Sequence, residues 1–362
     1  MSRIDDLIAE RCPDGVRHSP LGDLADLKRG ETITKEVANA DGKIPVVAGG
    51  RTAAYYHDAN NRSGPVIVIA GSGAYAGFVS WWDDPIWVSD AFSVIPKTDK
   101  LERRFIFHLL LEKQNWLHSL KSGGGVPHVY PKDVANLKVP VPPLEVQREI
   151  VRILDHFTEL EAELGAELEA RHKQYEHYRN ELLTFTEDEV RWVPMGELLR
   201  IRNGRDYKHL GKGNVPVFGS GGIMAYVDQH LTANPTVLIP RKGSLGNLYY
   251  VDQPVWTVDT IFYTEIDAEN LQPKYLFHFL KTQDLAGMNQ AGGVPSLTQS
   301  MLSKLVVPLP AMGRQQEIVD ILEKFEAFVN DISGGLPAEI EARRKQYEYY
   351  RGKLLTFAEV AS

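Results

Sequence analysis

Several kinds of residue and motif are scarce in this 362-residue chain, and each scarcity excludes a class of protein. The single cysteine, Cys12, excludes an intramolecular disulfide and a cysteine metal cluster, which fits a reducing compartment. No apolar run reaches about 18 residues, so we expect no membrane span. The N-terminal stretch MSRIDDLIAERCPDG has acidic residues where a secretory signal would be apolar, so we expect a cytoplasmic protein.

Sequence motifs for catalysis are also missing. The 11 histidines form no close cluster with cysteine or carboxylates, and neither G-x-S-x-G nor H-E-x-x-H occurs, so we expect no metal and no catalytic residue. The glycines of GSGAYAG (71–77) lack the G-x-G-x-x-G spacing of a dinucleotide site. FGSGG (218–222) resembles an adenosylmethionine loop but lacks the Asn/Asp-Pro-Pro-aromatic tetrapeptide of amino-methyltransferases. A stand-alone adenosylmethionine-dependent methyltransferase therefore stays only as an alternative.

The net charge of -8 is unevenly distributed along the chain. Residues 158–189 hold ten acids and three basic residues, whereas segments 17–140 and 191–310 each have a net charge of +2. The acidic segment is unsuited to phosphate, but the rest of the chain permits nucleic-acid binding without requiring it.

The sequence does contain a repeat of nearly its whole length. RHKQYEHYRNELLTF at 171–185 recurs as RRKQYEYYRGKLLTF at 343–357, with 11 of 15 residues identical. Upstream, VRHSPLGDL matches VRWVPMGEL, IPVVAGG matches VPVFGSG, and GGVPHVYPKDVANLKVPVPP matches GGVPSLTQSMLSKLVVPLPA. Such self-similarity predicts two copies of one fold.

Each copy has the same order of predicted elements. Short β-branched and aromatic runs precede a helix-like stretch, a VPxP strap and a long amphipathic helix, which indicates an α+β fold. We predict a globular domain with an N-terminal helix at 1–142, a long helix at 143–188, a second globular domain at 189–310 and a second long helix at 311–362.

The two long helices have apolar stripes that need a partner. Pairing the helices with each other favours an antiparallel coiled coil, which would relate the two halves by a pseudo-twofold axis. SGGLP at 333–337 contains two glycines and a proline, so we predict a break in the second helix there.

Glycine-rich loops at matching places in the two halves are the candidate binding sites. Backbone N–H groups freed by glycine, together with Arg, Lys and Ser side chains, suit contacts to phosphates and base edges. For any single residue the alternative is a purely structural role in an ordinary tight turn. The DNA-binding candidates are Arg51, Tyr55, Ser72, Gly73, Tyr75, Ser220, Gly221, Arg241, Lys242 and Ser244.

Two copies of VPxPxxxxQxEIVxIL, each followed by a helix ending in the RKQYEYYRxxLLTF signature, make the chain resemble the specificity subunit of type I restriction-modification systems. The resemblance covers essentially the whole chain. It implies a non-catalytic subunit with two target recognition domains, each reading one half of a bipartite, asymmetric DNA site, and with helices that fix the gap between them.

The resemblance also implies partners and their cofactors. Two modification (methyltransferase) subunits would bring adenosylmethionine, and restriction subunits would bring ATP and magnesium, so no cofactor is expected in this chain. A system with a fused restriction and modification partner, or a coiled-coil adaptor, are the further alternatives. The helix-pair or partner-docking candidates are Gln147, Tyr175, Tyr178, Arg179, Gln315, Tyr347, Tyr350 and Arg351.

Overall fold

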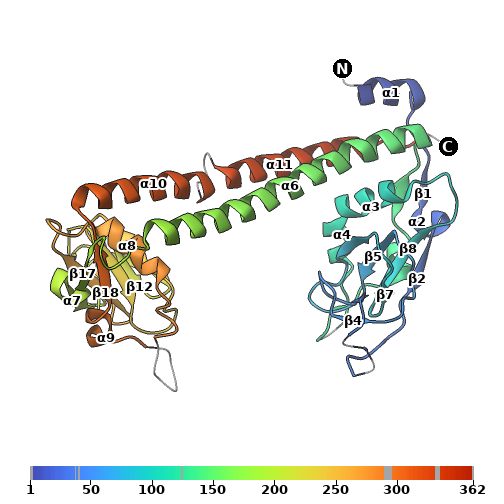
Figure 1. Ribbon diagram of the computed structural model, residues 1–362. Coiled ribbons are helices and arrows are strands. Elements are labelled where there is room, and N and C mark those ends of the chain that lie inside the picture. The colour runs from blue at the N-terminus through green and yellow to red at the C-terminus, as the bar shows by residue number, and fades with distance from the viewer. Residues whose placement is uncertain are drawn as a thin grey trace. The chain divides into compact units, whose positions relative to one another are not determined.

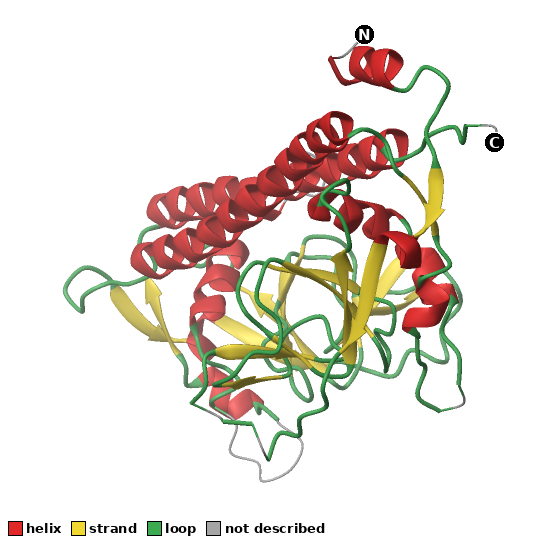
Figure 2. Cartoon of the chain, turned by 90° about the vertical axis from the view of Figure 1, so that its right-hand side faces the viewer, coloured by secondary structure: helices red, strands yellow, loops and turns green. Residues whose placement is uncertain are grey.

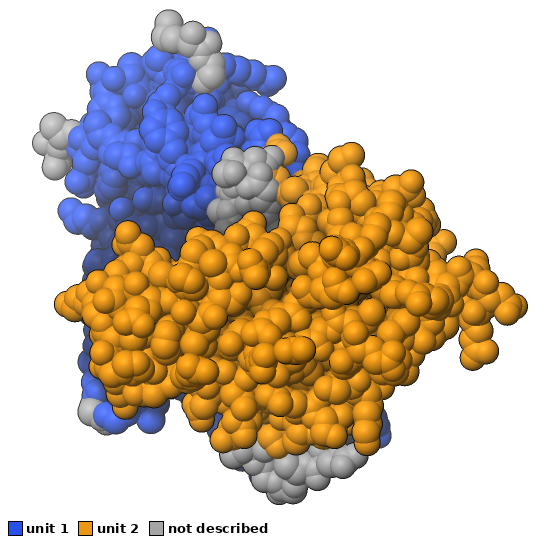
Figure 3. Space-filling model, turned by 90° about the vertical axis from the view of Figure 1, so that its left-hand side faces the viewer, with its two compact units in different colours: residues 1–164, 340–362 blue, residues 165–339 orange. Residues whose placement is uncertain are grey.

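The chain divides into two compact units. A computed structural model describes residues 3–36, 38–39, 41–123, 125–288, 296–330 and 335–360 (Figure 1). Unit 1 comprises Met1–Leu164 and Ile340–Ser362, and unit 2 comprises Gly165–Glu339; Figure 3 colours them separately. Each unit therefore combines one globular domain with parts of both long helical segments, whereas the sequence suggested contiguous domains and helices.

Unit 1 contains the first globular domain. Its helices are α1 (Arg3–Arg11), α2 (Leu21–Leu24), α3 (Arg103–Glu112), α4 (Gln114–Ser119), α5 (Pro131–Val134) and the first part of α6 (Leu144–Leu182). Its strands are β1 (His18–Pro20), β2 (Ala25–Arg29), β3 (Ile44–Val47), β4 (Tyr55–His57), β5 (Val66–Ala70), β6 (Val79–Trp82), β7 (Trp87–Val88), β8 (Ala91–Pro96) and β9 (Lys138–Pro140).

Unit 2 contains the second globular domain. Its helices are the rest of α6, α7 (Met195–Leu198), α8 (Pro273–Thr282), α9 (Gln299–Ser303), α10 (Met312–Asn330) and the start of α11 (Leu336–Leu354), whose remainder lies in unit 1. Its strands are β10 (Arg191–Pro194), β11 (Leu199–Asn203), β12 (Val215–Gly219), β13 (Gly222–Val227), β14 (Thr236–Pro240), β15 (Tyr249–Val251), β16 (Trp256–Thr257), β17 (Ile261–Ile266) and β18 (Val306–Leu309).

The sheets, whose strands are yellow in Figure 2, have the same topology in both units. Unit 1 has a four-stranded sheet in the order β2-β8-β5-β6, a three-stranded sheet β4-β3-β7 and the pair β1-β9. Unit 2 has β11-β17-β14-β15, β13-β12-β16 and β10-β18. In both three-stranded sheets the central strand pairs antiparallel with one neighbour and parallel with the other. The duplication expected from the repeat is confirmed at the level of strand order.

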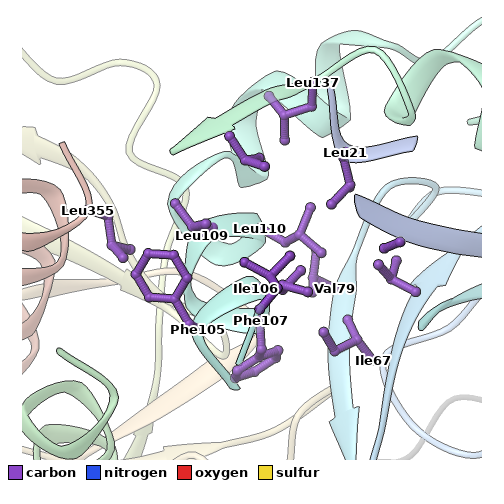
Figure 4. Packing of buried hydrophobic residues seen from close by; sticks show 14 of the residues in the cluster. Leu21, Ile67, Val79, Phe105, Ile106, Phe107, Leu109, Leu110, Leu137 and Leu355 are labelled. Carbon is purple, nitrogen blue, oxygen red and sulfur yellow. The ribbon is translucent and has the colours of Figure 1, made fainter. Parts of the chain in front are cut away.

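The core of each domain forms around a strand that has no exposed face. All residues of β5 and β14 are buried, which explains their continuous apolar, β-branched sequences. In unit 1 this sheet is covered by α3. In Figure 4, Ile106 and Leu110 lie on the side of α3 facing Ile67 and Val79, and Phe105 lies toward Leu355. Truncating one such side chain to alanine typically costs about 2–5 kcal/mol.

The long helices pair within each unit. In unit 1, Figure 1 shows α11 ending beside the start of α6, and the rings of Phe157 and Tyr350 stack with centroids 5.4 Å apart. In unit 2, α10 begins beside the end of α6, and Tyr175 stacks on Phe325 at 5.8 Å. The predicted antiparallel pairing is thus confirmed inside each unit.

The second helical segment consists of two helices. α10 ends at Asn330 and α11 begins at Leu336. Pro337 lies in the first turn of α11, where a proline is tolerated because the N–H that it lacks would have no partner within the helix. The predicted break at 333–337 falls partly on residues 331–334, which lie outside the described residues.

Candidate nucleic-acid interface

The loop after β5 in unit 1 is tied to a second loop. Gly73 has a φ of 79°, a left-handed conformation that favours glycine, and its N–H donates to the Pro127 carbonyl at 2.9 Å. Ser72 and His128 form an antiparallel bridge. The Ser72 hydroxyl donates to the Asp90 carboxylate and the residue is buried. Ser72 therefore supports the loop from inside, while Gly73 leaves open space beside its Cα.

Arg51 and Tyr75 come together from different loops of unit 1. The guanidinium carbon of Arg51 lies 4.9 Å from the Tyr75 ring centre and 5.5 Å from that of Phe78. Tyr75 is 43% exposed and Arg51 is also exposed, so the pair presents a cation on an aromatic support. Tyr55 is half-buried, and its hydroxyl donates to the Ile33 carbonyl, so its polar group is already occupied.

The equivalent loop of unit 2, residues 241–246, follows β14. Gly243 has a φ of 83°. Lys242 forms an antiparallel backbone β-bridge with Ser296, just as Ser72 does with His128 in unit 1. Lys242 and Ser244 are exposed. Arg241 is half-buried, with its guanidinium carbon 5.9 Å from the Phe262 ring centre. The two units thus share a loop geometry, but the side chain at the bridge is a buried serine in one and an exposed lysine in the other.

The β12–β13 hairpin turn lies against the 241–246 loop. The Ser220 carbonyl accepts hydrogen bonds from Asn247 Nδ2 at 3.2 Å and from the Tyr249 hydroxyl at 3.4 Å. A Cβ built on Gly243 would lie 3.3 Å from Ser220 Oγ, whereas Gly221 faces open space. The structure therefore brings the unit 2 candidates together around one hairpin.

Five further residues lie near this hairpin and are not among the candidates predicted from the sequence: Lys208, Lys212, Ile223, Met224 and Asn247. Exposed lysines in loops carry no sequence signal of their own. GIMAYV, however, has apolar residues on both faces of a strand at a domain surface, which departs from the usual alternation and was an available signal.

The helix-pair candidates of unit 1 surround a buried histidine. His108 Nδ1 lies 3.2 Å from the Tyr347 hydroxyl, and His108 Nε2 lies 2.8 Å from an oxygen of Asp155. Arg351 pairs with Glu112 at 2.8 Å and lies over the Tyr347 ring. Burial lowers the pKa of His108, although the Asp155 carboxylate opposes that shift.

Unit 2 repeats this cluster with different acids. The buried Tyr175 hydroxyl lies 3.4 Å from His278 Nδ1 and 3.4 Å from an oxygen of Glu326. Burial lowers the pKa of His278 to about 4 and raises that of Tyr175. Arg179 lies over the Tyr175 ring at 5.6 Å, but its buried Nε has no hydrogen-bond partner among the residues that the structure describes. Tyr178, by contrast, is exposed.

Gln147 and Gln315 lie in the interior rather than on a docking surface. Gln147 Oε1 accepts from the Glu102 N–H at 2.8 Å, and its Nε2 donates to the carbonyls of Lys100 at 3.0 Å and Pro142 at 2.7 Å. Gln315 makes the matching bonds with Gln272 N–H, Asn270 O and Pro310 O, each at 2.9 Å. Both glutamines are fully buried, so they fasten the start of a long helix to its own domain and cannot directly contact a partner.

Two negative findings apply to the part of the chain that the structure describes. It holds no group of three or more His, Cys, Asp or Glu residues placed to hold a metal ion. Within the same residues, no helix combines the length and the apolar character needed to cross a membrane.

Comparisons with known proteins identify the repeat. A family model described as the type I restriction modification DNA specificity domain matches residues 13–170 and again residues 187–342. A type I restriction enzyme specificity subunit of Escherichia coli is 32% identical over 281 residues, covering 67% of this chain and 69% of that protein.

Solved structures support the same fold. The crystal structure of a type I restriction-modification S subunit from M. genitalium matches with a TM-score of 0.63 at 20% identity, covering 94% of this chain and 96% of that one. A chain from a type I R-M structure described in terms of complex assembly and conformational transition matches with a TM-score of 0.64 at 19% identity, covering 95% and 98%. Because the family model matches both halves of the repeat, the chain belongs to the family of type I restriction-modification specificity subunits.

Proposed function

We propose that this chain is the non-catalytic DNA recognition subunit of a type I restriction-modification complex. Each globular domain reads one half of a bipartite, asymmetric site through the loop that follows its fully buried strand, β5 or β14, and through the adjacent hairpin. The observation that carries the proposal is the contrast at equivalent places. The strand order and the helix junction are repeated, but Ser72 in one unit is replaced by Lys242 in the other, and Gly49 is replaced by Ser220. A repeated fold that presents different polar side chains in its loops suits the recognition of two different half-sites.

The repeated helix junction suits two identical partners. Two methyltransferase subunits need two similar docking surfaces, and a duplicated frame offers them. These subunits supply adenosylmethionine, and restriction subunits supply ATP and magnesium, in the cytoplasm where the chromosome lies. The acidic stretch of α6 is suited to protein contact rather than to phosphate.

Methylome sequencing tests this function. The chain is co-expressed with the methyltransferase subunit of its own system in a host without adenine methylation, and the genome is read by single-molecule sequencing. We expect one adenine-methylated motif made of two short half-sites around a fixed gap. The matched control omits only this chain and should show no motif.

Other outcomes identify the alternatives. A purified, intact complex that methylates no motif, or that methylates adenines without a motif, would contradict sequence recognition and favour the adaptor. Binding of adenosylmethionine to this chain alone in isothermal titration would favour a stand-alone methyltransferase.

A further inference from the structure

The β12–β13 hairpin of unit 2 exposes an apolar surface. Ile223, Met224 and Tyr226 on β13 are 50%, 58% and 55% exposed. Three large apolar side chains so close together on one exposed strand mark an interaction surface, whereas isolated ones would not. Ala225 lies among them and Val227 ends the strand in the core, so the strand is anchored at one end and apolar at the other.

A β-bulge produces this exposure. Val217 pairs with Ala225 and Phe218 pairs with Ile223, so Met224 has no residue opposite it. In a regular strand, neighbouring side chains point to opposite faces. The bulge breaks that alternation, which allows Ile223 and Met224 to be exposed together.

The hairpin is held in place from its base. Val217 is fully buried, and Gly222 has a φ of 110°, which fixes a turn that favours glycine. The hydrogen bonds from Asn247 and Tyr249 to the Ser220 carbonyl fasten the turn to the start of β15 and the residue shortly before it. The exposed residues are therefore presented by a supported ribbon.

Cations lie beside the hairpin in two separate segments. Tyr207, Lys208 and Lys212 line a groove of about 430 Å³ with Tyr226. Lys242 lies in the 241–246 loop, which packs against the turn.

These lysines are available to a ligand. Among the described residues, Lys208, Lys212 and Lys242 have no carboxylate within ion-pair distance. Asp228, just beyond β13, uses one carboxylate oxygen to accept the Gly211 N–H at 3.0 Å. An apolar ribbon flanked by free lysines matches a duplex groove, whose apolar and hydrogen-bonding base edges lie between two rows of phosphates.

We propose that this hairpin enters the DNA major groove and that Ile223 and Met224 contact the 5-methyl groups of thymines in one half-site, with the three lysines on the phosphates. The inference rests on the proposed function and adds the base group that is read. The major groove admits a two-stranded ribbon, and the thymine methyl is its apolar recognition group. In unit 1 the corresponding residues of the β3–β4 hairpin are Ala53 and Ala54, so contacts by long apolar side chains of this kind are confined to one half-site.

The test removes the methyl group from the DNA and the apolar group from the protein. Once the motif is known, each thymine in both half-sites is replaced in turn by deoxyuridine, which lacks only the methyl. The dissociation constant of the complex with its methyltransferase subunits is then measured. We expect one or two positions, all in the same half-site, to weaken binding about fourfold each.

The protein variants Ile223→Ser and Met224→Ser complete a double-mutant cycle. Each should weaken binding to the thymine duplex by a similar factor and show no further loss on the deoxyuridine duplex. Tyr56→Ser, at an exposed tyrosine of the unit 1 hairpin, is the matched control and should leave the deoxyuridine effect unchanged. Unfolding curves verify that the variants fold.

Several results would overturn the inference while leaving the proposed function intact. One is a site-specific complex in which deoxyuridine has no effect at any position, or in which its effect adds fully to that of the Ser variants. Another is unchanged DNA affinity with loss of the methyltransferase subunits, which would make the hairpin a protein-docking element. Absence of any site preference in the unaltered complex would instead overturn the proposed function.

Discussion

In unit 1, Gln147 fastens α6 to the domain before it; in unit 2, Gln315 fastens α10 in the same way, through the same three types of hydrogen bond. The hairpins of the two units differ: the β3–β4 connection carries Arg51 on an aromatic support, whereas β12–β13 carries an apolar bulge. The two units therefore share the glutamine that joins each long helix to its domain, and they differ in the hairpin that each domain presents at its surface.

The largest effect is expected from removing the buried tyrosines. Tyr347→Ser and Tyr175→Ser each remove a ring buried between helix and domain, and we expect each to lower the free energy of unfolding by about 3–5 kcal/mol. Urea unfolding measures this loss. Tyr349→Ser, at an exposed ring of α11, is the control and should cost less than about 1 kcal/mol. A folded Tyr175→Ser protein that methylated a different motif would show that this residue reads bases.

The buried glutamines should be the next most sensitive positions. Gln147→Ala and Gln315→Ala each leave one N–H and two carbonyls without that partner, which should cost about 2–4 kcal/mol. Similar losses in both variants would confirm the equivalence of the two junctions. The neighbouring exposed Gln316→Ala is the control. A loss confined to one glutamine would break the comparison.

Acidification should weaken unit 2 through His278. Because its folded pKa of about 4 lies below the ordinary value of about 6.5, the unfolded chain binds a proton that the folded chain does not. The contribution of neutral His278 to the free energy of unfolding is therefore fully present above about pH 6.5. It is lost as the pH falls from 6.5 to 4, and the loss is roughly 3 kcal/mol at most.

Unfolding across that pH range measures the effect, and His278→Gln should flatten the slope. His108→Gln should also reduce the dependence of the unfolding free energy on pH, because burial lowers the pKa of His108 as well. An unchanged slope in the His278 variant would show that this histidine does not carry the pH dependence.

Lys242→Ala addresses the difference between the loops. If Lys242 contacts a phosphate, its loss should reduce the slope of log affinity against log salt by about one, with a loss of a few fold near physiological salt. A salt titration of DNA binding gives the slope. Lys324→Ala, at an exposed residue of α10, is the matched control. An unaltered slope would remove Lys242 from the interface.

The smallest effect tests a missing ion pair. Arg351 in unit 1 pairs with Glu112. The corresponding Arg179 in unit 2 has Thr282 at the position of that glutamate, and its buried Nε has no partner within the described part of the chain. Thr282→Glu should stabilise the protein by about 0.5–1 kcal/mol in thermal unfolding. Thr282→Glu introduced into an Arg179→Met variant should give no increase in stability. A gain in that background would assign the effect to something other than the pair.

The sequence predicted the frame better than the site. Internal repetition and the 3-and-4 spacing of apolar residues are local patterns, and they indicated the duplication and the antiparallel pairing found within each unit. Tyr175 and Tyr347 were identified because their whole neighbourhood recurs. Their histidine partners, His278 and His108, lie about 100 and 240 positions away in the chain, and no local pattern links them.

The sequence by itself determined that the chain has two similar halves, which segments are helical, and where glycine-rich loops interrupt the strands. Only the tertiary structure decided which loop residues are exposed. Ser72 and Lys242 occupy equivalent places, but one hydroxyl is used by Asp90 inside the domain and the other side chain is free at the surface. Likewise, the register shift that exposes both Ile223 and Met224 depends on which residues of β12 they face. Burial and pairing depend on chain segments that meet in space, so periodicity alone does not fix them.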